Sequence, residues 1–235
     1  MPDDMFLFVD RTEAGEQLAG VLLTEPLIQE TPRDKLLVLS IPRGGVIVGA
    51  AVAQGLECAH EVAVVKKIGF PGHEEMAIGA MTEDGMLVLN KDVVVSPKLH
   101  DYIEQQEKQI KAKIKAYVQK FHQGRQSCLK SKTVILVDDG IATGETMKAA
   151  VIGLLSKDKT QHPGKVLVAV PVCSPPAARE LSMLADKLVC LAVPEQFWAV
   201  GQFYWDFDQI SDEEVLEYLV QTDSNECKAN DLAGK

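Results

Sequence analysis

The stretch that decides the fold runs from Val134 to Thr146 and reads VILVDDGIATGET. It contains a buried-type strand, two adjacent acids, a glycine-interrupted turn and the start of a helix. Small loop residues let successive backbone N–H groups converge on a phosphate, and the following helix N-terminus adds its dipole. Asp138 and Asp139 stand where the strand ends, the place at which α/β sheets bind ligands, and carboxylates accept hydrogen bonds from ribose hydroxyls. The pattern predicts a ribose-phosphate site.

The alternative for this segment is an ordinary strand-loop-helix turn in which the acids merely cap the helix. The segment is neither a Walker loop, since Gly-Lys-Ser/Thr is absent, nor a GxGxxG dinucleotide loop. The complete strand-acid-acid-loop-helix arrangement favours the functional interpretation over capping.

Short apolar runs rich in Val, Leu and Ile recur along the chain without polar alternation, as in strands buried on both faces. Apolar stretches at helical spacing lie between them, so we expect a doubly wound α/β fold with a mainly parallel sheet. The predicted strands are Leu36 to Ile41, Val62 to Val65, Thr133 to Val137, Lys165 to Val170 and Leu188 to Val193.

Two further helices are predicted. Asp10 and Glu13 have capping-box spacing, so a first helix should begin near Asp10, and we expect it to cover one sheet edge. A long helix is expected between about Pro97 and Gln123, because one apolar stripe runs along it. The stripe should pack inside the chain, with a dimer contact as the alternative. It consists of Ile103, Ile110, Ile114, Tyr117, Val118 and Phe121.

Two other segments could meet a phosphorylated ligand. The first strand is followed by Pro42-Arg43-Gly44-Gly45, where glycines permit close approach and Arg43 can pair with phosphate oxygens. Lys66 and Lys67 precede a turn-rich loop from Gly69 to Gly79, which we expect to close over a site as a lid with few apolar anchors. The alternatives are a glycine turn with a surface arginine, and a surface hairpin with solvated lysines.

Composition narrows the possible functions. The chain has 235 residues, 46% of them hydrophobic, and a net charge of -10, which argues against general binding to nucleic acid or membrane surfaces. We expect one domain over residues 1–220, a disordered tail over 221–235, and a cytoplasmic location, since the N-terminus matches neither a signal peptide nor a membrane span. The five scattered cysteines suggest neither disulfides nor a zinc site.

Together the segments PRGG, KKIGFPG, AIGA and DDGIATG resemble type I phosphoribosyltransferases, in particular a bacterial group of predicted ones, over nearly the whole chain. The resemblance implies that Asp138 and Asp139 face the ribose hydroxyls of phosphoribosyl pyrophosphate, and that Arg43 with Lys66 or Lys67 lies near its pyrophosphate. It also implies Mg²⁺, with both acids reaching the ion through water. The expected substrate-binding residues are Pro42, Gly44, Gly45, Gly140, Ile141, Ala142, Thr143, Gly144, Glu145, Thr146 and Phe197.

Two positions depart from the family pattern. Glu145 stands where a small or neutral residue is usual, so its carboxylate must either point away from the phosphate or weaken binding. The aromatic segment PEQFWAVGQFYWDF is similar to the hood of hypoxanthine-guanine phosphoribosyltransferases, where the residue matching Phe197 stacks on the purine. Most of the six aromatics should nevertheless pack in the core. The hood lysine of those enzymes is absent, because the matching strand ends Pro171-Val172-Cys173-Ser174.

The resemblance therefore implies a pentosyltransferase that moves ribose 5-phosphate to a nitrogen acceptor, a nucleobase, and releases pyrophosphate. We expect a homodimer that binds neither nucleic acid nor membranes. The alternatives are a regulator that senses phosphoribosyl pyrophosphate or a nucleotide, and a nucleotide-binding scaffold without turnover.

Overall fold

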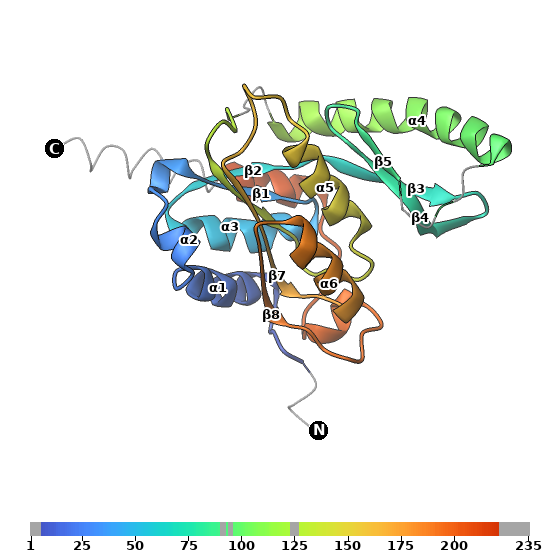
Figure 1. The fold of residues 1–235 in the computed structure, drawn as a ribbon. Helices are drawn as coiled ribbons and strands as arrows, with labels where there is room; N and C mark the ends of the chain where they lie inside the picture. The colour runs from blue at the N-terminus through green and yellow to red at the C-terminus, as the bar shows by residue number, and fades with distance from the viewer. Residues whose placement is uncertain (1–5, 90–92, 94–95, 123–126, 221–235) are drawn as a thin grey trace.

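The structure is a computed structural model that describes residues 6–89, 93, 96–122 and 127–220. Its centre is a five-stranded parallel sheet in the order β2-β1-β6-β7-β8 (Figure 1). This confirms the predicted α/β class and the mainly parallel sheet. The strands are β1 (Leu36–Ser40), β2 (Ala59–Val62), β6 (Thr133–Val137), β7 (Lys165–Val172) and β8 (Lys187–Ala192).

Helices cover both faces of this sheet, as expected for a doubly wound fold (Figure 1). On one face lie α1 (Arg11–Leu22) and α3 (Gly44–Leu56), and on the other lie α5 (Glu145–Leu155) and α6 (Pro175–Leu184). Every residue of β1 and β6 is buried, which explains why these strands lack polar alternation. The short α2 (Pro26–Gln29) and the 3-10 turn η1 (Arg33–Lys35) connect α1 to β1.

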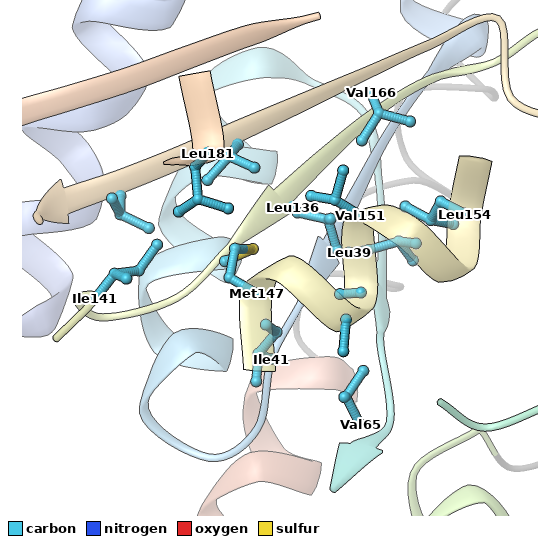
Figure 2. Packing of buried hydrophobic residues seen from close by; sticks show 14 of the residues in the cluster. Leu39, Ile41, Val65, Leu136, Ile141, Met147, Val151, Leu154, Val166 and Leu181 are labelled. Carbon is cyan, nitrogen blue, oxygen red and sulfur yellow. The ribbon is translucent and has the colours of Figure 1, made fainter. Parts of the chain in front are cut away.

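The core on the α5 face anchors the loop between β6 and α5 (Figure 2). Met147 and Val151 of α5 pack against Leu136 and Val166 of the sheet, and Ile141 of the loop joins the same cluster. Burying a side chain of this size stabilises the fold by roughly 1.5–3 kcal/mol. Ile141 and Met147 therefore fix the loop at both of its ends.

The first helix begins where the capping box predicts. Asp10 Oδ1 accepts a hydrogen bond from the backbone N–H of Glu13 at 2.8 Å, and Glu13 Oε2 accepts one from the N–H of Val9 at 2.6 Å. The helix packs beside α3 on a face of the sheet, over β7 and the edge strand β8, in keeping with the predicted position at one sheet edge. Gly15 allows this approach, since a Cβ there would lie 2.7 Å from the Cβ of Ala51.

A second, antiparallel sheet consists of β3 (Val65–Phe70), β4 (His73–Thr82) and β5 (Leu87–Leu89). The predicted single strand from Val62 to Val65 is wrong, because β2 ends at Val62 and β3 begins at Val65 in the other sheet. The expected turn-rich loop is also wrong, since Gly69 to Gly79 is mostly β-hairpin. Within it Ile78 is a buried apolar anchor, and Ile68 just ahead of it is buried as well.

The long helix α4 (Pro97–His122) packs along the antiparallel sheet (Figure 1). Its predicted stripe is buried at Ile103, Ile110, Ile114 and Phe121, so packing within the chain accounts for the stripe in place of the alternative dimer contact. Residues 212–220 form a further helix whose apolar side joins the same cluster. The predicted tail, 221–235, lies outside the described residues. Among the described helices, none is long and apolar enough to cross a membrane.

Candidate active site

The two glycine-containing turns predicted to share a ligand meet at the carboxyl end of the sheet. β1 and β6 are neighbours in register, and the N–H of Ile41 donates to the carbonyl of Val137 at 2.8 Å. A Cβ at Gly45 would lie 2.8 Å from the Cα of Asp138, and a Cβ at Gly44 would overlap the carboxylate of Asp139. Both glycines are therefore required by the close approach of the two turns.

The loop between β6 and α5 presents a row of backbone donors. No acceptor within the described part of the chain receives the N–H groups of residues 142–146. Gly144 adopts a φ of 79°, which only glycine tolerates readily, and Ser174 holds the loop by donating to the carbonyl of Ala142 at 2.5 Å. Free amides ahead of a helix N-terminus form an anion site, so this geometry suits a phosphate.

The carboxylate of Glu145 forms an ion pair with Lys148, one turn further along α5. Lys148 Nζ lies 2.5 Å from Glu145 and 2.6 Å from Glu180 of α6. Both hydrogen bonds raise the pKa of Lys148 against the effect of burial. The lysine therefore offsets the negative charge that Glu145 brings to the first turn of the helix.

Asp139 is held by two residues that the sequence interpretation did not assign to the site. Arg11 Nε lies 2.8 Å from Asp139 Oδ2, and the hydroxyl of Tyr204 donates to the Asp139 backbone carbonyl at 2.5 Å. Burial raises the pKa of Tyr204, so its hydroxyl stays protonated. The only sequence signal for Arg11 is its place in the first turn of a helix, where the dipole disfavours a cation.

The carboxyl of Asp138 is strongly perturbed by its surroundings. Burial, followed by the charge of Asp139, raises the pKa of Asp138 well above its usual value, while Arg11 opposes the shift. Its Oδ1 accepts the backbone N–H of Asp139 at 2.9 Å. A buried carboxyl whose pKa is raised by a neighbouring charge is typical of functional sites.

Three cationic side chains gather around Asp212. Lys120 Nζ lies 3.0 Å from its carboxylate, and a guanidinium nitrogen of Arg43 lies 4.0 Å from it. Lys66 stacks 3.5 Å above the ring of Tyr117, and burial lowers its pKa while Asp212 opposes this and Arg43 adds to it. The structure therefore brings Arg43 and Lys66 into one electrostatic cluster.

Lys67 follows Lys66 along β3 and is exposed. Successive residues of a strand point to opposite faces, so it is separated from this cluster. Of the two predicted lysines, the geometry favours Lys66.

The aromatic segment is divided between core and surface. Phe203 and Tyr204 are buried, whereas Trp198 and Trp205 are 86% and 74% exposed. Phe197, the predicted stacking residue, is half-buried with its ring centre 5.1 Å from that of Phe203. Phe207 likewise packs against the cluster that contains Phe203 and Tyr204, so the prediction that most of the six aromatics pack in the core is confirmed, and the two tryptophans are the exceptions.

Cys173 and Ser174 occupy the place of the missing lysine. Cys173 is buried, and burial raises the pKa of its thiol to about 12, so it is not a nucleophile at neutral pH. His60 is buried against Ser40 at 2.7 Å, and burial lowers its pKa to about 3. It is therefore a neutral packing residue. Within the described ranges no group of three His, Cys, Asp or Glu side chains could hold a metal ion.

A cavity of about 320 Å³ lies elsewhere, between β2, the end of β4 and α5. None of the predicted site residues lines it. Its polar groups are largely paired with one another, since Lys157 lies 2.9 Å from Asp84, and His122 lies 3.4 Å from Glu83. The chemistry predicted from the sequence is therefore not located in this cavity.

Comparison with known proteins identifies the family. The family model described as "Phosphoribosyl transferase domain" matches residues 16–208. Two proteins of Mycobacterium tuberculosis, each named "Putative phosphoribosyl transferase", are 40% identical over 220 residues. The match covers 92% of this chain and 47% of each relative, so the chain spans about half the length of these curated relatives. The crystal structure of TT1426 from Thermus thermophilus matches with a TM-score of 0.73 and 36% identity, over 91% of this chain and 98% of that one.

Proposed function

The chain belongs to the phosphoribosyl transferase family, and we propose that it transfers ribose 5-phosphate from phosphoribosyl pyrophosphate to a nitrogen acceptor, a nucleobase, with release of pyrophosphate. One observation carries the proposal: the free N–H groups of residues 142–146 and the acid pair lie beside the Arg43 turn. In this reaction a bond forms between the acceptor nitrogen and the anomeric carbon, and the bond from that carbon to the pyrophosphate oxygen breaks. Positioning and electrostatics dominate such chemistry.

Each part of the site has a separate task in this proposal. The N–H groups of residues 142–146 and the α5 dipole hold the 5′-phosphate, while the carboxyls of Asp138 and Asp139 accept the ribose hydroxyls. Arg43, Lys66 and the amides of Gly44 and Gly45 stabilise the negative charge that develops on the leaving pyrophosphate. No covalent nucleophile is required, in keeping with the buried, neutral state of Cys173.

The residues present fit Mg²⁺ as the metal. With no three-ligand cluster in the described chain, the ion would be held chiefly by substrate oxygens and waters, with Asp138 and Asp139 reaching it through water. This is the usual manner in which Mg²⁺ binds together with phosphorylated substrates. When bound, Mg²⁺ would neutralise charge on the leaving group.

A second candidate function is a regulator that binds phosphoribosyl pyrophosphate or a nucleotide without turnover. The observation that favours it is the pair Cys173 and Ser174 where purine-specific relatives have a lysine. A cytoplasmic location and a homodimer remain predictions.

Pyrophosphate release distinguishes these functions. The assay supplies phosphoribosyl pyrophosphate, Mg²⁺ and one nucleobase at a time. We expect release with at least one nucleobase and a loss of about tenfold or more in Arg43→Gln, the effect of one lost charge-assisted hydrogen bond. Arg33→Gln is the matched control, because Arg33 is exposed at the opposite end of β1.

Binding without release for any nucleobase would favour the regulator. Absence of binding would contradict both functions.

A further inference from the structure

Arg11 occupies a costly position for a cation. It is the first residue of α1, where the helix dipole repels positive charge, and only 8% of its surface is exposed. A buried arginine is retained only where charge partners and hydrogen bonds compensate its desolvation. The residues that pair with Arg11 should therefore explain why an arginine occupies this position.

The partners of Arg11 come from two distant parts of the chain. Nε donates to Asp139 Oδ2 at 2.8 Å, after β6, and Nη1 donates to the carbonyl of Asp208 at 2.9 Å, in the C-terminal segment. The guanidinium carbon lies 3.8 Å from the centre of the Phe207 ring. Two hydrogen bonds and one ring face fix the planar group in a single orientation.

Asp139 is fixed in turn on both its side chain and its backbone. Arg11 occupies Oδ2, while the hydroxyl of Tyr204 holds the backbone carbonyl at 2.5 Å. A carboxylate offers about four acceptor positions, so Oδ1 can still accept a further hydrogen bond. The side chain of Asp139 is 15% exposed, which leaves it accessible to a ligand from one side.

We propose that Arg11 is a positioning residue for ribose recognition, holding the Asp139 carboxylate with one oxygen on its guanidinium and the other directed to a ribose hydroxyl. This inference rests on the proposed function, in which Asp139 binds ribose. Its physical advantage is preorganisation, because the acceptor is immobilised before the ligand arrives. The α1 helix and the C-terminal segment thereby become part of the sugar site.

A double-variant cycle tests the proposal. Calorimetric titration of phosphoribosyl pyrophosphate with Mg²⁺ is compared in the unmodified chain, Arg11→Met, Asp139→Asn and the double variant. We expect about tenfold weaker binding in each single variant and no further loss in the double variant, because Arg11 acts only through Asp139. Arg11→Lys keeps the charge but loses the planar two-donor group that stacks on Phe207, so we expect its affinity to lie between that of Arg11→Met and that of the unmodified chain.

Asp10→Ala is the control for an effect that arises only from a less stable α1. It removes the cap of the same helix end without touching Asp139, so its melting temperature should fall while its affinity stays within about twofold of the unmodified chain. If Arg11→Met does not fold, Arg11→Gln retains an N–H donor and serves in the same cycle.

Independent, multiplying losses in the double variant would overturn the positioning role, as would unchanged affinity in both uncharged Arg11 variants. Unchanged binding in Asp139→Asn would instead overturn the proposed function.

Discussion

Replacing Asp138 with asparagine separates the two interpretations of the acid pair. Asp138→Asn keeps the size of the side chain and its acceptor for the Asp139 N–H, which lies 2.9 Å away. If Asp138 binds a ribose hydroxyl, the lost charge-assisted hydrogen bond should cost about 1.5–3 kcal/mol, or about tenfold to a hundredfold in affinity. The loss should be similar for every acceptor base, because the residue faces the sugar.

The same variant should not lose stability. Burial and Asp139 raise the pKa of Asp138 above its unfolded value, so folding takes up a proton and stability falls as the pH rises from about 4 through the raised pKa. Asparagine has no such proton to lose. The unfolding free energy of Asp138→Asn should therefore exceed that of the unmodified chain by an amount that grows over this pH interval.

Calorimetric titration with phosphoribosyl pyrophosphate and Mg²⁺, beside denaturant unfolding at several pH values, measures both effects. Asp186→Asn is the matched control, because Asp186 pairs with Lys165 at 2.8 Å near the amino ends of β7 and β8. It should lose stability and keep its affinity. A stability loss in Asp138→Asn with unchanged affinity would refute the reasoning and leave Asp138 a purely structural residue.

Three other variants or measurements test separate parts of the account. Gly44→Ala should lower the affinity for phosphoribosyl pyrophosphate by about tenfold or more, because its Cβ would overlap the carboxylate of Asp139. Gly20→Ala, with no atom within 4 Å of the added Cβ, should instead raise the unfolding free energy by about 0.5–1 kcal/mol. If the two variants had the same affinity and the same melting temperature, the close approach at Gly44 would be contradicted. Glu83→Gln should destabilise the chain most below about pH 6.5. The Glu83 carboxylate lies 3.4 Å from His122 Nε2 and raises the pKa of His122, so the stabilisation from this ion pair is lost as the pH rises through the raised value. Denaturant unfolding at about pH 5.5 and about pH 8.5 measures the difference, and a pH-independent cost would count against the ion pair. Hydrogen exchange at the turn between β3 and β4 should slow when phosphoribosyl pyrophosphate and Mg²⁺ bind, and exchange that is equally slow in both states would argue against lid closure.

Features that depend on residues close together in the sequence, such as a helix start or a strand-loop-helix segment, were predicted correctly. Asp10 caps α1 by accepting the N–H of Glu13, and Glu13 accepts the N–H of Val9 just ahead of the cap, so this short-range spacing locates the start of α1. The segment from Val134 to Thr146 was predictable for the same reason, since strand, acids, loop and helix follow one another without interruption.

Tertiary contacts set the limits of that prediction. Val62 and Val65 are both buried but lie in two different sheets, and an apolar run alone does not show where one sheet ends and the other begins. The Gly69 to Gly79 segment contains many turn residues, yet pairing between β3 and β4 makes it a hairpin. In both places long-range pairing overrides the local signal.

The candidate site shows the same division. The residues that follow β1 and β6 were predictable, because the ends of neighbouring parallel strands must meet at one sheet edge. Arg11 and Tyr204 lie 128 and 65 residues from Asp139 in the sequence, so nothing local connects them. The exposure of Trp198 likewise depends on how the C-terminal segment folds back over the sheet.

The most direct test of the central claim is a crystal structure of the chain with phosphoribosyl pyrophosphate and Mg²⁺. The account predicts the 5′-phosphate on the backbone N–H groups of residues 142–146, the ribose hydroxyls on Asp138 and Asp139, and the pyrophosphate beside Arg43. Density for the ligand in the separate cavity near Glu83, with these residues unoccupied, would contradict it.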